Sequence, residues 1–225
     1  CGVFAAISCA YGKPQVLITK WMKSNLEWWS TFFSEGAAPV SMLVRPPTAK
    51  FIPTTDASGK GYGGVFMGEE HGSPIIYYFY GDWAADVQTL FNNNRIDINI
   101  LELVTIQFLL HLAGKTIQHQ SLTIMCDNSS SVNLLTNYRA RTWASGVVLG
   151  AIDVLLATND IDAKFEWIAT DLNRLSDWLS RKRLQEFRDR VRQEHGNSVR
   201  MVELQVPTHL REISHIVRTI SWSRA

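Results

Sequence analysis

The sequence is poor in cysteine, has almost no net charge and lacks any apolar run long enough to cross a bilayer. Its three cysteines, Cys1, Cys9 and Cys126, have no spacing typical of a zinc site or a disulfide framework, so we expect a reducing, intracellular compartment, cytoplasmic or nuclear. The longest apolar stretch, 147–157, is interrupted by a glycine and an aspartate. It is far shorter than the ~20 residues of a membrane helix, and no signal peptide is visible. The formal net charge of +1 excludes a globally basic nucleic-acid binder, so any such contact must come from local patches.

What is present is the composition of a folded protein with one main core. The chain has 225 residues, of which 46% are hydrophobic and 19% charged, enough for one full domain plus appendages. It begins with Cys1 rather than Met, from which we expect a piece of a longer polypeptide. Composition shifts predict three parts: a helical connection segment over 1–48, a main domain over 49–182 and a basic helical tail over 183–225.

The two flanking parts carry helix signals of their own. Residues 24–27 (SNLE) fit a capping box, and the aromatic residues within 28–33 are expected to pack against a neighbouring domain rather than stack on bases. In the tail, apolar residues form one stripe over 184–191 among arginines, and a second helix is predicted from Pro207. The basic tail face is expected to be solvated, with contact to a phosphate backbone as the alternative.

The main part alternates between strand and helix patterns after an opening hairpin. Strands are predicted over 51–56, 61–66, 74–80, 121–126 and 163–168, and helices over 97–113, from 129, over 143–157 and over 172–181. Residues 81–95 read as polar and irregular. This order predicts an α/β domain with a mixed five-stranded sheet, three antiparallel strands followed by parallel additions, flanked by helices.

Four acids stand at the edges of these apolar elements: Asp56, Glu102, Asp127 and Asp177. Considered without the other three acids, Asp56 is interpreted as a turn aspartate whose side chain hydrogen-bonds to the backbone of its own loop. If the first and fourth strands are neighbours, Asp56 and Asp127 project from adjacent strands, and the two helices can bring their acids to the same edge. Four converging carboxylates would repel each other unless cations held them. Oxygen ligands select Mg²⁺ or Mn²⁺, and two such ions spaced about 3.5–4 Å apart suit phosphoryl transfer.

Four segments in order resemble the ribonuclease H domain of a retrotransposon reverse transcriptase of the LTR type, with most similarity to the DIRS-like group. They are 55–66 (TDASGKGYGGVF), 98–103 (INILEL), 126–130 (CDNSS) and 173–181 (NRLSDWLSR). Residues 26–29 (LEWW) resemble, in modified form, a D-L-x-W-W segment that links polymerase to nuclease in that group.

The resemblance implies a ribonuclease-H-like fold and a metal-dependent endonuclease that hydrolyses the RNA strand of RNA–DNA hybrids. It implies that Asp56, Glu102, Asp127 and Asp177 are catalytic residues and ligands of two Mg²⁺ ions, for which Mn²⁺ can substitute. Asp56 would bridge both ions. Asp177 would hold the ion that activates the attacking water, and Glu102 and Asp127 would hold the ion that stabilises the leaving 3′ oxygen. It also implies a polymerase domain in the same polyprotein as a partner, and no membrane.

Three further residues are candidates for substrate contacts. Ser58 and Asn128 have plain turn chemistry as their alternative, and for Asn173 a helix cap is the preferred interpretation. The sequence departs from the family at Ser176, where alanine is frequent, and at 167–171, which lacks a histidine. Two other functions stay open: a catalytically weak or domesticated interaction module, and an integrase or transposase core. The latter is disfavoured because the glutamate comes second among the acids.

Overall fold

The computed structural model describes residues 51–140 and 142–211, with isolated helical positions between 23 and 34. The start of the predicted capping box (24–25), the aromatic residues of 28–33 and the tail beyond 211 lie outside the described residues. Within the described ranges, no helix has the length and apolar character needed to span a bilayer.

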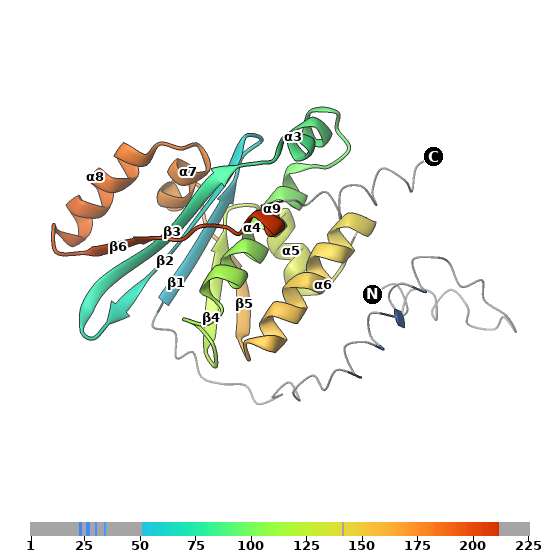
Figure 1. Cartoon of the computed structure of the whole chain (residues 1–225), viewed down its shortest axis with the longest axis horizontal. Coiled ribbons are helices and arrows are strands. Elements are labelled where there is room, and N and C mark those ends of the chain that lie inside the picture. Colours follow the sequence, from blue (N-terminus) through green and yellow to red (C-terminus); the bar gives the residue numbers. More distant parts are fainter. Residues whose placement is uncertain are drawn as a thin grey trace, which may run out of the picture.

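A mixed six-stranded sheet forms the centre of the described chain, with strand order β5-β4-β1-β2-β3-β6 (Figure 1). The strands are β1 (Phe51–Ala57), β2 (Gly61–Glu70), β3 (Ser73–Asp82), β4 (Ser121–Cys126), β5 (Asp162–Trp167) and β6 (Arg200–Glu203). The first three pair antiparallel, β4 pairs parallel with β1, and β5 pairs parallel with β4. The predicted α/β class, with three antiparallel strands followed by parallel additions, is confirmed.

The prediction of five strands was wrong, because the tail contributes a sixth. Strand β6 pairs parallel with the outer side of β3, from Ile75 opposite Arg200 to Tyr78 opposite Glu203. The strand has only four residues, of which the first and last are charged, and this is too short to show a period of two, so the sequence pattern did not indicate a strand. The three-part division of the chain stays a prediction, but residues 184–203 pack against the same sheet as the main part.

Seven helices are described around the sheet. They are α3 (Ala85–Asn92), α4 (Ile98–Ala113), α5 (Ser129–Asn137), α6 (Trp143–Thr158), α7 (Arg174–Ser180), α8 (Leu184–His195) and α9 (Thr208–Arg211). Helix α3 corrects the prediction of an irregular segment over 81–95. Its apolar residues Val87, Leu90 and Phe91 have helical spacing, but the helix has only eight residues, too few for the pattern to stand out in a polar segment.

Alternating side chains on the central strands form two cores on opposite faces of the sheet. On one face, Phe66 and Phe79 pack under α4, α5 and α6. On the other, Val65 and Ile76 pack against residues of α7 and α8, including Phe187. Helices α7 and α8 lie on the side of the sheet away from α4 and α6 (Figure 1). The apolar stripe predicted over 184–191 is therefore confirmed as a buried helix face.

Helix α7 lies unusually close to β2 because that strand has glycines on the facing side. A Cβ added at Gly63 would lie 2.5 Å from both the Leu179 Cβ and the Ser180 amide nitrogen. A Cβ at Gly61 would lie 2.9 Å from the Ser180 carbonyl oxygen. The glycine-rich second strand therefore provides the room in which α7 approaches the sheet.

Candidate active site

The carboxyl ends of β1 and β4 lie side by side at one edge of the sheet. Their parallel register places Thr54 beside Met125 and Thr55 beside Cys126. Asp56 and Asp127 are the next residues along each strand, so they stand at equivalent positions. The expectation that the first and fourth strands are neighbours is confirmed, and this edge is where α/β sheets carry their sites.

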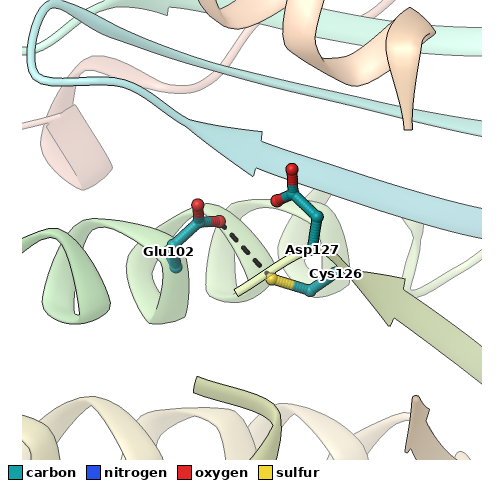
Figure 2. Close-up of side chains that lie close together, drawn as sticks. All are labelled: Glu102, Cys126 and Asp127. Carbon is teal, nitrogen blue, oxygen red and sulfur yellow. Dashed lines mark hydrogen bonds between the residues drawn. The ribbon is translucent and has the colours of Figure 1, made fainter. Parts of the chain in front are cut away.

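Glu102 reaches this edge from α4, on the face of the larger core. Its side chain is 3% exposed, and the Cys126 thiol donates a hydrogen bond of 3.5 Å to its Oε2 atom. Figure 2 shows Glu102 projecting from α4 toward the end of β4, where Cys126 and Asp127 follow each other. One ligand atom from each of these three residues lies within 4.8 Å of the other two. Two of the four predicted acids thus share one compact group of potential metal ligands.

Asp56 is buried beside this group and is held by α7. The Ser180 hydroxyl donates a hydrogen bond to its Oδ2 atom. Burial, together with the charges of Asp127 and Asp177, raises the pKa of Asp56 to about 6, although the Ser180 bond opposes the rise. The influence of Asp127 and Asp177 places both carboxylates within electrostatic range of Asp56.

Asp177 comes from the first turn of α7 and forms an ion pair with Arg181, the residue that caps the end of this helix. The Arg181 Nε atom lies 2.6 Å from the Asp177 Oδ1 atom. In the described residues, the compact ligand group includes neither Asp177 nor Asp56. The structure therefore brings all four predicted acids to one end of the sheet, with Glu102 and Asp127 in close proximity and Asp177 turned to Arg181.

The donor chemistry of the site fits hard divalent cations. Burial, followed by Asp56 and Asp127, raises the pKa of Glu102 to about 9, so close carboxylates here resist ionisation in the absence of a cation. Burial and the Glu102 carboxylate also raise the pKa of the Cys126 thiol, which disfavours the thiolate that a soft metal needs. Oxygen ligands remain, and these are the ligands that Mg²⁺ and Mn²⁺ prefer.

The three candidates for substrate contacts each have a partner inside the protein. The Ser58 hydroxyl closes the β1–β2 turn by accepting from the Gly61 amide at 3.0 Å. The Asn128 Oδ1 atom accepts from the Ser131 amide at 3.0 Å and caps α5. Contact of these residues with a substrate stays a prediction.

Asn173 stands at the N-cap position of α7, but its side chain makes no capping bond, which corrects the expected role. Instead, the side chain is 1% exposed, and its Nδ2 atom donates to the Thr55 carbonyl at 2.8 Å. It joins α7 to β1.

Three residues around the site were not predicted: Ser180, Arg181 and Trp167. Trp167, at the end of β5, is 57% exposed, and its indole nitrogen donates to the Asp127 carbonyl at 2.9 Å. Ser180 follows Asn173 at a helical spacing of seven, a signal that could have indicated a polar helix face directed at β1. Arg181 follows Asp177 at i+4, a spacing that could have indicated the ion pair, whereas no local pattern identifies Trp167, whose partner is 40 residues away.

Comparison with known proteins finds similarity among solved structures alone: no family model and no curated protein matches the sequence. A ribonuclease H1 from the halophilic archaeon Halobacterium salinarum is 14% identical with a TM-score of 0.45; the alignment covers 61% of this chain and 99% of the other. The N-terminal ribonuclease H domain of a Mycobacterium tuberculosis protein is 14% identical with a TM-score of 0.42, covering 63% and 96%. Prototype foamy virus protease–reverse transcriptase is 13% identical with a TM-score of 0.38, covering 73% and 21%.

Proposed function

We propose that this protein is a metal-dependent ribonuclease H that cuts the RNA strand of RNA–DNA hybrids. We further propose that it is the nuclease part of an intracellular retroelement reverse transcriptase of the LTR type, close to the DIRS-like group, with a polymerase domain in the same polyprotein. The observation that carries the proposal is the convergence of four acids from two strand ends and two helices, two of them buried carboxylates with raised pKa.

In this proposal the protein's residues hold and orient the reacting groups. Asp56, Glu102, Asp127 and Asp177 would hold two Mg²⁺ ions, or Mn²⁺ in their place. Bound there, the ions would supply the charge that favours hydroxide formation and stabilises the leaving oxygen. Glu102, which α4 carries to the edge of the sheet, would contact a ribose 2′-hydroxyl and so distinguish RNA from DNA.

One observation favours the alternative of a weakly active interaction module. The ion pair between Asp177 and Arg181 neutralises one of the four acids within the protein. A nuclease must release or share that carboxylate when a cation binds, whereas a module would keep the pair intact. The two functions therefore differ in whether the protein cuts an RNA–DNA hybrid, which can be measured.

The test is cleavage of a 5′-labelled RNA–DNA hybrid in Mg²⁺ by the wild type and by Asp127→Asn. We expect the variant to lose more than about 100-fold in rate, because loss of a residue that only supports a metal ligand already costs about 10–100-fold. Asp189→Asn is the matched control, since Asp189 is an exposed acid on α8 whose partner is Gln185. It should retain full activity.

The other outcomes identify the alternatives. A folded wild type that binds the hybrid without cutting it would support the interaction module. Nicking or joining of duplex DNA would support an integrase or transposase core.

A further inference from the structure

A line of buried polar side chains joins α7 to β1, and we call it the α7–β1 seam. Three residues of one face of α7 contact three consecutive residues of the strand. The pairs are Asn173 Nδ2 with the Thr55 carbonyl at 2.8 Å, Ser176 Oγ with Thr54 Oγ1 at 2.7 Å, and Ser180 Oγ with Asp56 Oδ2. All six residues are buried. The seam therefore runs without a break along the end of β1 that carries Asp56.

Stability alone does not account for polar pairs in this place. An apolar contact between helix and strand would avoid the desolvation of the five polar side-chain groups of these pairs, which is costly unless every one is satisfied. Apolar contacts already exist on the same helix, since Leu179 is fully buried in the smaller core. Unlike apolar contacts, hydrogen bonds fix both the height of a short helix along a strand and its rotation.

Fixing α7 also fixes Asp177, which lies on that helix between Ser176 and Ser180. The Ser180 hydroxyl has one proton and two acceptors, the Asp56 carboxylate and the Asp177 carbonyl at 3.0 Å. A bond to an ionised carboxylate is the stronger of the two, so Asp56 is the preferred acceptor once it is charged. Ser180 is thus connected to both aspartates of this half of the site.

We propose that Ser180 is a positioning residue, which orients the Asp56 carboxylate for a divalent cation, while Ser176 and Asn173 hold α7 at the height that brings Asp177 to the same cation. The inference rests on the metal binding that the proposed function includes. It does not need the substrate to be a hybrid.

The test measures Mn²⁺ binding by isothermal titration calorimetry, beside thermal unfolding without metal. We expect Ser180→Ala to bind Mn²⁺ about 10–100-fold more weakly, as is typical when a residue that orients a metal ligand is removed. The control is Ser121→Ala, because Ser121 also donates to an aspartate, Asp162 at 3.1 Å, but at the opposite end of β4. This control should lose stability and keep Mn²⁺ affinity within about twofold of the wild type.

Ser180→Thr separates positioning from packing. It retains the hydroxyl but adds a methyl group at a buried position, so its unfolding temperature should fall while its Mn²⁺ affinity stays near that of the wild type. If Ser180→Ala does not fold, a double variant with Thr54→Val and Ser176→Ala takes its place, since it removes both hydroxyl groups of one seam contact. This pair should also weaken Mn²⁺ binding.

Wild-type Mn²⁺ affinity in folded Ser180→Ala would overturn the inference, whatever the nuclease assay shows. A wild type that binds Mn²⁺ and cuts no hybrid, with weak binding in Ser180→Ala, would reject the nuclease and retain the seam. A wild type that binds no Mn²⁺ would reject both.

Discussion

Glu102 and Asp56 are acids that the fold removes from water and places beside other acids. The pKa of Glu102 is raised to about 9 and that of Asp56 to about 6, in both cases mainly by burial. A group whose pKa is raised on folding contributes stability below its unfolded pKa and loses that contribution as the pH rises through the folded pKa. Without a bound cation, the two residues therefore destabilise the protein increasingly from about pH 4 to pH 9.

We expect the free energy of unfolding, measured with urea in the presence of a chelator, to fall as the pH rises from 5 to 9. Glu102→Gln removes the charge. At pH 9 the free energy of unfolding of this variant should therefore exceed that of the wild type by more than about 1.4 kcal/mol, the equivalent of one pKa unit. Added Mg²⁺ should stabilise the wild type at high pH and have little effect on the variant. Glu194→Gln, an exposed pair partner of Arg190, is the control. A wild-type stability that rises over this range would contradict the assignment of buried acids.

Helix α7 is the element on which the site depends most, since it carries Asp177 and the bond to Asp56. Its closeness to the sheet requires Gly63, as the absence of a side chain there admits Leu179 and Ser180. Leu179, which faces Gly63, is fully buried, so a side chain at position 63 would have to displace it.

Gly63→Ala should displace α7 and lower both the stability and the Mn²⁺ affinity. Extra atoms in a packed interior cost about 1–3 kcal/mol, and a shifted helix also moves Asp177 away from its neighbours. Gly150→Ala in α6 is the matched control: a Cβ there has nothing within 4 Å, so it should leave Mn²⁺ binding unchanged and stabilise the helix by up to about 1 kcal/mol. The measurements are urea unfolding and calorimetry. Equal behaviour of the two variants would show that the close approach at Gly63 has no importance.

The elements could be predicted from the sequence where they are long and periodic. Helix α4 ends one residue before Gly114, as its pattern indicated, and β4 ends directly before Asp127. Helix α3 and strand β6 could not, because they have only eight and four residues, which is too short for a periodic pattern to be recognised. The α7–β1 seam was also missed, since its partners are more than a hundred residues apart in the chain.

At the scale of the whole molecule, the second core is completed by residues that follow Asp177, the last of the four acids, in the sequence. Phe187 and Val191 of α8 are fully buried against Val65, Ile76 and Leu179. Strand β6 then extends the sheet beside β3. The region predicted as a basic tail therefore covers a face that would otherwise expose apolar side chains of the central strands.

Phe187→Ala should destabilise the protein by about 3–5 kcal/mol, the usual cost of removing a large buried ring. Leu172→Ala is the control, because Leu172 is 72% exposed and its truncation should change stability by less than about 0.5 kcal/mol. Denaturant unfolding of both variants gives the comparison. A small effect of Phe187→Ala would mean that α8 contributes little to the folded unit.

The long sequence separations within the site have a consequence for protein synthesis. Ser180 and Asp56 lie 124 positions apart, and the Tyr78–Glu203 bond between β3 and β6 spans 125. A nascent chain on the ribosome exposes β1 and its aspartate long before α7 emerges. Since Ser180 follows Asp56 by 124 positions, Asp56 has no α7 hydroxyl to orient it until α7 has been synthesised, and we expect cation binding only after that point.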